Sequence, residues 1–177
     1  MRAIWYLLKC PAGDEADYVR EYQKMMPSGK LQEVICFQYQ RMLRYGGQWH
    51  LERRTLLPGC VFLSGSERSL PEADMSVQNV KKGRQTGARA GGGENRISLT
   101  PCEPPFWKTL CQKDYLLPMS RGIIKDGSPI VTGGPLMGHE GLIRRIDRHK
   151  RTAEIGVPFA GQEMRVTVGL EIYQKQI

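Results

Sequence analysis

The sequence predicts an α+β domain followed by a small all-β barrel of about five antiparallel strands. Three observations carry this prediction. Up to about residue 65, apolar stretches follow one another in the order strand, helix, hairpin, strand. After residue 129, apolar and polar residues alternate with a period of two, and glycines recur where these stretches end. Closure into a barrel would leave such a small sheet without exposed edges.

The first two elements are a strand and a helix. The stretch "IWYLLKC" at 4–10 is rich in aromatic and aliphatic residues, which predicts a buried strand. The following "PAGDEADYVREYQKMM" predicts an amphipathic helix that Asp14 caps and that Pro27 and Gly29 end. Its apolar stripe is expected to be core and consists of Tyr18, Val19, Tyr22, Met25 and Met26.

A hairpin and a further strand complete the predicted sheet. The stretches "EVICFQYQRMLRY" and "QWHLERRTLL" read as two strands joined by a tight turn at Gly46 and Gly47. "LPGCVFLSG" predicts a short strand, and "RSLPEADMSV" a short helix. The segment 81–96 contains five glycines and five basic residues but no large apolar side chain, which predicts a mobile loop.

The second half begins with a short helix near Pro105, in "EPPFWKTLCQKDYLLPM". "SRGIIKDGSP" then contains a turn signal and little else to anchor it, so we expect a boundary here. The predicted domains are 1–120 and 129–177, joined by a linker at 121–128. The smaller domain is of a size at which independent stability is marginal.

A basic run lies within the predicted barrel. "RRIDRHKR" carries five Lys or Arg side chains, one His and one Asp around the single apolar Ile146, and the alternation around it places it near a hairpin tip. Arginine suits bidentate phosphate contacts and stacking on unpaired bases, which favours RNA over a smooth duplex. On charge alone, a solvated basic turn without a ligand fits the run equally well.

Net charge and cysteine usage limit the class of protein. The formal net charge of +8 favours polyanionic partners without naming one. Five irregularly spaced cysteines argue against a disulfide framework and predict reduced, mostly buried thiols in a cytosolic protein. Because no apolar run is long enough for a signal peptide or a membrane span, we expect neither export nor membrane insertion.

The sequence contains little evidence of a catalytic or cofactor-binding motif. His139 and Glu140 begin like the zinc motif H-E-x-x-H, but Ile143 occupies the position of the second histidine. Neither His50 nor His149 is spaced as a ligand with a cysteine pair, and the glycine-rich segment lacks the G-K-[ST] of a phosphate-binding loop. We therefore expect no enzyme activity, no metal and no cofactor.

The stretch "VTGGPLMGHEGLIRRIDRHKR" resembles the KOW motif of the NusG family of transcription elongation factors. That motif has a hydrophobic strand, a G-P-[LF]-x-G turn and a glycine, here Gly141, after which a second strand begins. "WYLLKC" and "LLPGCVFL" are similar to two strands of the family's N-terminal (NGN) domain, which usually shows W-Y and P-G-Y-[VL]. The resemblance covers nearly the whole chain and is weakest over 77–99. The closing "GLIRRIDRHKRTAEIGVPFAGQEMRVTVGLEI" is most similar to LoaP, an antiterminator subgroup associated with long biosynthetic operons.

The resemblance implies a monomeric, two-domain antiterminator of the bacterial cytoplasm. Its NGN domain would bind the clamp of RNA polymerase, on the β′ subunit, and its KOW barrel would bind a structured leader RNA. The KOW domain of one relative, RfaH, can also fold as a helical hairpin that packs against the first domain. The glycine-punctuated, β-branched tail of this chain predicts a permanent barrel instead.

The resemblance also implies two sets of binding residues. Tyr6, Leu57, Phe62 and Leu63 fall on the positions that line the family's polymerase-facing pocket, although Cys60 stands where the family usually has Tyr. All four could instead be plain core, which for Leu63 is the better interpretation. The expected RNA-binding residues are Arg144, Arg145, Arg148, His149, Lys150 and Arg151.

Two other readings remain open: a KOW-bearing RNA-binding protein of the translation apparatus, and a general NusG-type factor whose KOW domain binds a ribosomal protein or a termination factor. The salt dependence of RNA affinity distinguishes the RNA-binding interpretations from the one in which the KOW domain binds a protein. If about three to five phosphates are neutralised, log affinity should fall with log salt at a slope of roughly −2 to −3.5. Charge reversal of Arg144 and Arg148 should flatten that slope in binding assays over a salt series. No RNA affinity even at low salt would favour a protein partner.

Overall fold

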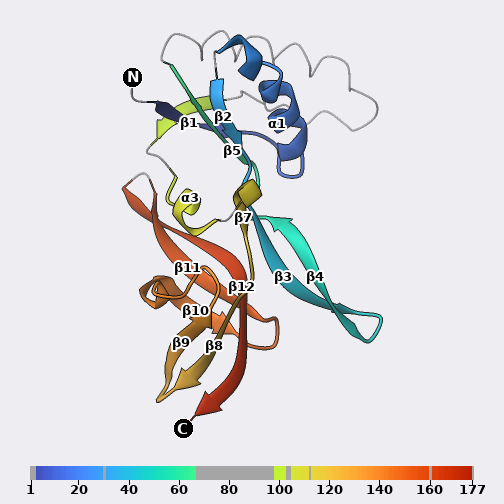
Figure 1. Cartoon of the computed structure of the whole chain (residues 1–177), viewed down its shortest axis with the longest axis vertical. Helices are drawn as coiled ribbons and strands as arrows, with labels where there is room; N and C mark the ends of the chain where they lie inside the picture. The colour runs from blue at the N-terminus through green and yellow to red at the C-terminus, as the bar shows by residue number, and fades with distance from the viewer. Residues whose placement is uncertain are drawn as a thin grey trace, which may run out of the picture. The chain divides into compact units, whose positions relative to one another are not determined.

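The computed structural model describes residues 3–29, 31–66, 98–102, 105–111, 113–159 and 161–176 (Figure 1). The described part of the chain is mixed α+β, mostly sheet with few helices. Its described residues fall into two compact units, one within Met1–Cys36 and Pro58–Pro104, the other within Phe37–Leu57 and Pro105–Ile177. The helix predicted in "RSLPEADMSV" and the loop predicted at 81–96 lie outside the described residues.

The first unit is a four-stranded antiparallel sheet with a helix on one face. The strands are β1 (Ile4–Lys9), β2 (Leu31–Ile35), β5 (Cys60–Gly65) and β6 (Ser98–Cys102), in the order β2-β5-β1-β6. Helix α1 (Glu15–Gln23) follows β1, and the 3-10 turn η1 (Met26–Ser28) follows α1. The predicted strands 4–10 and "LPGCVFLSG" and the predicted first helix are confirmed.

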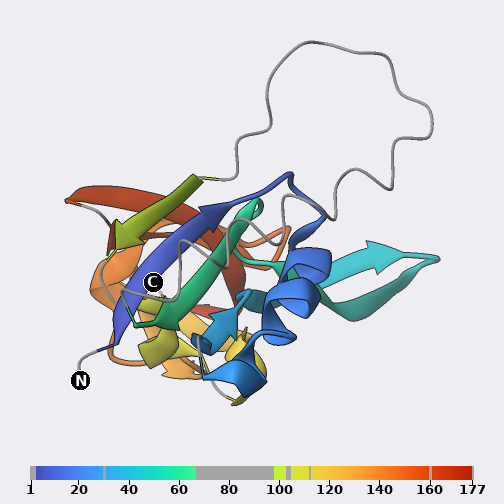
Figure 2. The same ribbon diagram turned by 90° about the horizontal axis from the view of Figure 1, so that it is seen from above.

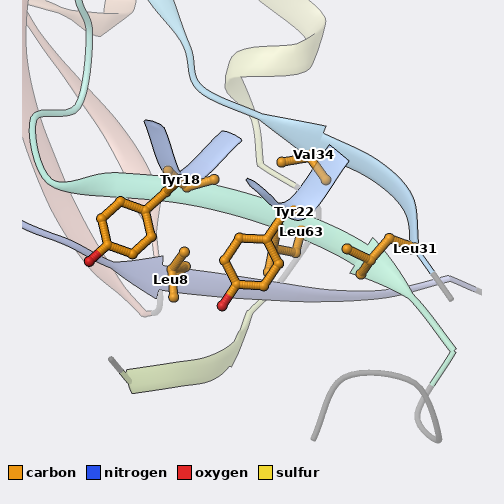
Figure 3. Packing of buried hydrophobic residues seen from close by; sticks show 7 residues of the cluster. Leu8, Tyr18, Tyr22, Leu31, Val34 and Leu63 are labelled. Atoms are coloured by element: carbon orange, nitrogen blue, oxygen red, sulfur yellow. The ribbon is translucent and has the colours of Figure 1, made fainter. Parts of the chain in front are cut away.

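The core of this unit lies between α1 and the sheet. Tyr18 and Tyr22 of α1 pack against Leu8, Val34 and Leu63 of the strands (Figure 3). Val19, Met25 and Met26 pack around this cluster, so the predicted apolar stripe is core, as expected. Burying side chains of this size contributes about 1.5 to 3 kcal/mol each, which outweighs the modest helix propensity of the two tyrosines.

The start of α1 differs from the prediction. Asp14 occupies the N-cap position but makes no side-chain capping hydrogen bond. Its neighbour Glu15 is buried, and the two oxygens of its carboxylate accept hydrogen bonds from the backbone N–H of Gly13 (2.9 Å) and of Gly59 (2.6 Å). Glu15 therefore ties the helix to the residue just before β5, a long-range partner that local capping rules do not include.

The second unit contains a hairpin of β3 (Gln38–Tyr45) and β4 (Gln48–Thr55), with β7 (Leu116–Leu117) parallel to β3. The predicted turn is confirmed, with Gly46 at φ 58° and Gly47 at φ 76°. The single strand predicted over "EVICFQYQRMLRY" is wrong, because β2 and β3 belong to different sheets. The helix expected near Pro105 is confirmed as the short α3 (Trp107–Leu110), followed by the 3-10 turn η3 (Lys113–Tyr115).

The remaining strands of this unit form one five-stranded sheet. They are β8 (Ser120–Lys125), β9 (Ser128–Gly133), β10 (Ile143–Asp147), β11 (Thr152–Phe159) and β12 (Gln162–Gln176), in the order β10-β11-β12-β8-β9, with the 3-10 turn η4 (Glu140–Leu142) before β10. The expected number of strands is present. The segment 121–128, which the sequence predicts as a linker, lies on β8, on the turn after it and on the first residue of β9. The division into 1–120 and 129–177 stays a prediction.

The sheet departs from the predicted barrel in two ways. Within the described residues its outer strands, β9 and β10, do not pair with each other, so no closed barrel is present. Strand β12 also runs parallel to β8, whereas every pairing had been expected to be antiparallel. The alternation of a strand reveals which face is buried, but it carries no information on the direction of the neighbouring strand.

Strand β12 changes its pairing partner at Gly169. Residues up to Gly169 pair with β11, and those from Leu170 onward pair with β8. A Cβ atom at Gly169 would overlap the backbone carbonyl oxygen of Gln40 and the sulfur of Met119. Only glycine therefore permits this approach of β3 to β12.

We expect Gly169→Ala to lower the free energy of unfolding by about 1 to 3 kcal/mol, because the added methyl group must displace backbone of the hairpin. Urea unfolding followed by circular dichroism measures the difference. Gly133→Ala is the matched control, since a Cβ there meets no atom within 4 Å. Equal stability of the two variants would show that the close approach at Gly169 is not required.

Candidate nucleic-acid interface

The basic run lies on β10 and on the turn that joins it to β11. Arg144 and Arg145 belong to β10, and Arg148 to Arg151 form the turn, as expected for a hairpin tip. The Asp147 carboxylate accepts a hydrogen bond from the backbone N–H of Lys150 at 3.0 Å. Arg151 closes the turn at a positive φ of 51°, and its N–H donates to the carbonyl oxygen of Arg148.

Arg144 is engaged within the protein. Its Nε lies 3.2 Å from both carboxylate oxygens of Glu163, its Nη2 lies 2.8 Å from Oε2, and its Nη1 donates to the carbonyl oxygen of Gly141 at 2.6 Å. The hydrogen bond with Arg144 lowers the pKa of Glu163, and the same bond raises the pKa of Arg144. Arg144 would therefore have to leave a bidentate partner to contact RNA.

Two further predicted residues are also paired. Arg151 lies 2.9 Å from the Glu171 carboxylate, and its guanidinium stands over the ring of Trp49 at 4.0 Å from the centroid. Lys150 is 3.8 Å from the Asp147 carboxylate, a loose and exposed pair that solvent screens. Of the six predicted residues, Arg144 and Arg151 are thus held most firmly by other side chains.

Arg145, Arg148 and His149 are exposed and make no side-chain hydrogen bond or ion pair within the described residues. The two arginines keep their charge and all their donor groups. They are the part of the predicted cluster that an anionic ligand can reach without breaking an internal contact.

Sequence reasoning missed Trp49, the residue that places the turn beside the hairpin. Residues 49 and 151 are about a hundred positions apart, so no local pattern joins them. The closest signal was the alternation of "QWHLERRT", which assigns Trp49 to one face of a strand but does not indicate what covers that face.

The three residues of the first unit that are implied to face polymerase are divided between the two faces of its sheet. Tyr6 and Leu63 stand opposite each other on β1 and β5, and both pack in the α1 core. Phe62, one residue before Leu63, is on the other face of the sheet. Leu57 belongs to the second unit. Phe62, Leu63 and Leu57 are 1%, 0% and 6% exposed, so only the half-buried Tyr6 offers side-chain surface to a partner, and the polymerase-binding role stays a prediction.

The cysteines are free thiols, but only Cys60 is buried, so the expectation of mostly buried thiols was wrong. Partial burial raises the pKa of Cys10 to about 12, of Cys36 to about 11 and of Cys111 to about 12, with Glu15 contributing to the first two. These thiols are protonated at neutral pH and are weak nucleophiles.

Within the described part of the chain, no group of three or more His, Cys, Asp or Glu residues could hold a metal ion. No described helix is long and apolar enough to cross a membrane. Comparison with protein-family models and with curated proteins gives no match.

The lowered pKa of Glu163 gives a direct test of the pair with Arg144. A carboxylate with a depressed folded-state pKa stabilises the fold above its unfolded pKa, and that contribution is lost as pH falls through the folded value. We expect Arg144→Gln to raise the pKa of Glu163 part of the way to its ordinary value, since Arg165 still contacts the carboxylate. An NMR titration of the Glu163 carboxyl carbon measures this shift. Arg145→Gln should leave it unchanged, and an equal shift in both variants would contradict the pairing.

Proposed function

We propose that the protein is a specialised NusG-like transcription antitermination factor, which binds RNA polymerase through its N-terminal unit and structured RNA through its five-stranded sheet. The observation that carries the RNA-binding part is the exposed pair Arg145 and Arg148 beside the β10–β11 turn. Neither arginine has a carboxylate partner within the described residues, so both can neutralise phosphate.

The local structure of the motif "GGPLMG" supports a KOW-like unit. Gly134 has φ 93°, and a Cβ there would lie 2.6 Å from the Cα of Ser120. Leu136 is fully buried, and its backbone N–H donates to the buried hydroxyl of Ser120 at 3.1 Å. The glycine and the leucine of the motif thus each have a packing role that holds the turn before β10 against β8. An antiparallel sheet with a helix on one face, as in the first unit, is also what an NGN domain requires.

The chemistry of the arginine side chain suits a surface that binds a folded RNA. A guanidinium can contact a phosphate with two parallel hydrogen bonds and can stack on a base that a loop or bulge leaves unpaired. Because Arg144 is held by Glu163, we expect Arg145 and Arg148 to contribute more than Arg144 to the salt dependence of RNA binding. A protein bound at once to polymerase and to the leader RNA would keep its effective concentration at the elongating enzyme high.

A protein partner for the five-stranded sheet is the second candidate function. Ile130 of β9 and Tyr173 of β12 are exposed apolar side chains, and the Thr132 hydroxyl lies 3.2 Å from that of Tyr173. An apolar surface of this kind suits a protein better than RNA. It corresponds to the general NusG-type reading, in which a ribosomal protein or a termination factor is bound.

Transcription across an intrinsic terminator tests the proposed function. With bacterial RNA polymerase and a template that encodes a structured leader, we expect the protein in excess to raise read-through. Arg145→Ala with Arg148→Ala should remove most of the increase, because the tether to the leader is lost. Lys125→Ala with Lys175→Ala is the charge-matched control: both lysines are exposed, at the far end of the β8–β12 pair. Unchanged read-through with the unmodified protein would refute the proposal.

A further inference from the structure

The β3–β4 hairpin has two chemically different faces. Residues directly opposite each other in an antiparallel ladder share a face. One face therefore carries three cross-strand pairs: Gln40 with Arg53, Met42 with Leu51, and Arg44 with Trp49. We refer to these six residues as the hairpin face. Its two ends are about four residues apart, or roughly 13 Å.

Two contacts hold the hairpin face beside the β10–β11 turn. At one end, the Gln40 side-chain oxygen accepts a hydrogen bond from the backbone N–H of Met119 at 3.2 Å, and the Gln40 carbonyl lies against Gly169. At the other end, the Arg151 guanidinium stacks on Trp49. Because Arg44 is the cross-strand partner of Trp49, it lies at the same end of the hairpin face as this contact with the last residue of the turn. Figures 1 and 2 show the hairpin as a ribbon whose own turn stands clear of the five-stranded sheet.

The charges of the two faces differ. On the hairpin face, Arg44 and Arg53 are exposed and have no carboxylate partner within the described residues, and Leu51 between them is 54% exposed. The opposite face carries Glu52, whose carboxylate binds Arg54 at 2.7 Å. The opposite face also carries the half-buried Arg41, so within the described residues the two exposed arginines of the hairpin that have no carboxylate partner both lie on the hairpin face.

We propose that the hairpin face is the second half of the RNA site, so that Arg44 and Arg53 bind phosphates of the same RNA that Arg145 and Arg148 contact. This inference rests on the proposed function. The separation of roughly 13 Å allows each arginine of the hairpin face to reach a different phosphate. The exposed Leu51 supplies an apolar surface for an unpaired base, which a folded RNA offers and a regular duplex does not.

The experiment uses the full chain and a fluorescent stem–loop RNA with an unpaired loop, titrated at several salt concentrations. We expect Arg44→Ala with Arg53→Ala to weaken binding about tenfold and to reduce the slope of log affinity against log salt by about 1 to 2. Arg44→Lys with Arg53→Lys should retain most of the slope, because the charge is kept. Lys125→Ala with Lys175→Ala removes the same net charge from the same unit and should leave both quantities close to those of the unmodified protein.

The outcomes separate the inference from the proposed function. If the unmodified protein does not bind the stem–loop even at low salt, both fail. If Arg145→Ala with Arg148→Ala abolishes binding while the hairpin variant behaves like the lysine control, the hairpin face is not part of the site and the proposed function stands. Equal affinity for a duplex DNA of the same length would overturn folded RNA as the occupant. Circular dichroism of each variant confirms that a loss of binding is not a loss of fold.

Discussion

The second unit depends on the long strand β12, which forms ladders with two different partners in succession. It pairs with β11 over its first part and with β8 over its second, so its continuity joins β10 and β11 to β8 and β9. The change of partner occurs beside Gly169, where the backbone of β3 approaches too closely for any side chain. One glycine thus serves both the bend of the sheet and the seating of the hairpin against it. The position of Arg44 and Arg53 relative to the five-stranded sheet follows from that contact.

Internal pairing decides which cations of this basic chain remain free for a ligand. Glu163 engages Arg144, and Glu171 lies close to both Arg151 and Arg121. Exposed ion pairs of this kind add little stability, but they fix the direction in which a guanidinium points. Their effect here is to engage some guanidinium groups with carboxylates, while Arg145 and Arg148 stay available to a ligand. The net charge of the chain is therefore a poor guide to where a polyanion would bind.

In the first unit, burial in the core likewise decides which of the apolar residues can contact a partner. The family resemblance places a partner-binding pocket on strands β1 and β5, yet a strand alternates between two faces, and the four implied residues divide between them and the second unit. Phe62 and Leu63 fill core positions that exclude water and partners alike. Tyr6 differs because it is only half-buried. A polymerase contact at this sheet would therefore have to be centred on Tyr6 and on neighbours that the resemblance did not identify.

The sequence by itself determined the elements whose signals are local. The apolar stripe of α1, the paired glycines of the β3–β4 turn and the alternating strands after residue 129 all depend on side chains within a few residues of one another. Only the tertiary structure decided the parallel pairing of β12 with β8, the open edges of the five-stranded sheet, the use of Glu15 rather than Asp14 at the helix start, and the contact of Trp49 with Arg151. These features join residues tens of positions apart. Local propensity and periodicity contain no information on such partners. The sequence therefore predicted the basic run, but only the folded chain shows which of its arginines are held by other side chains and that Trp49 lies beside it.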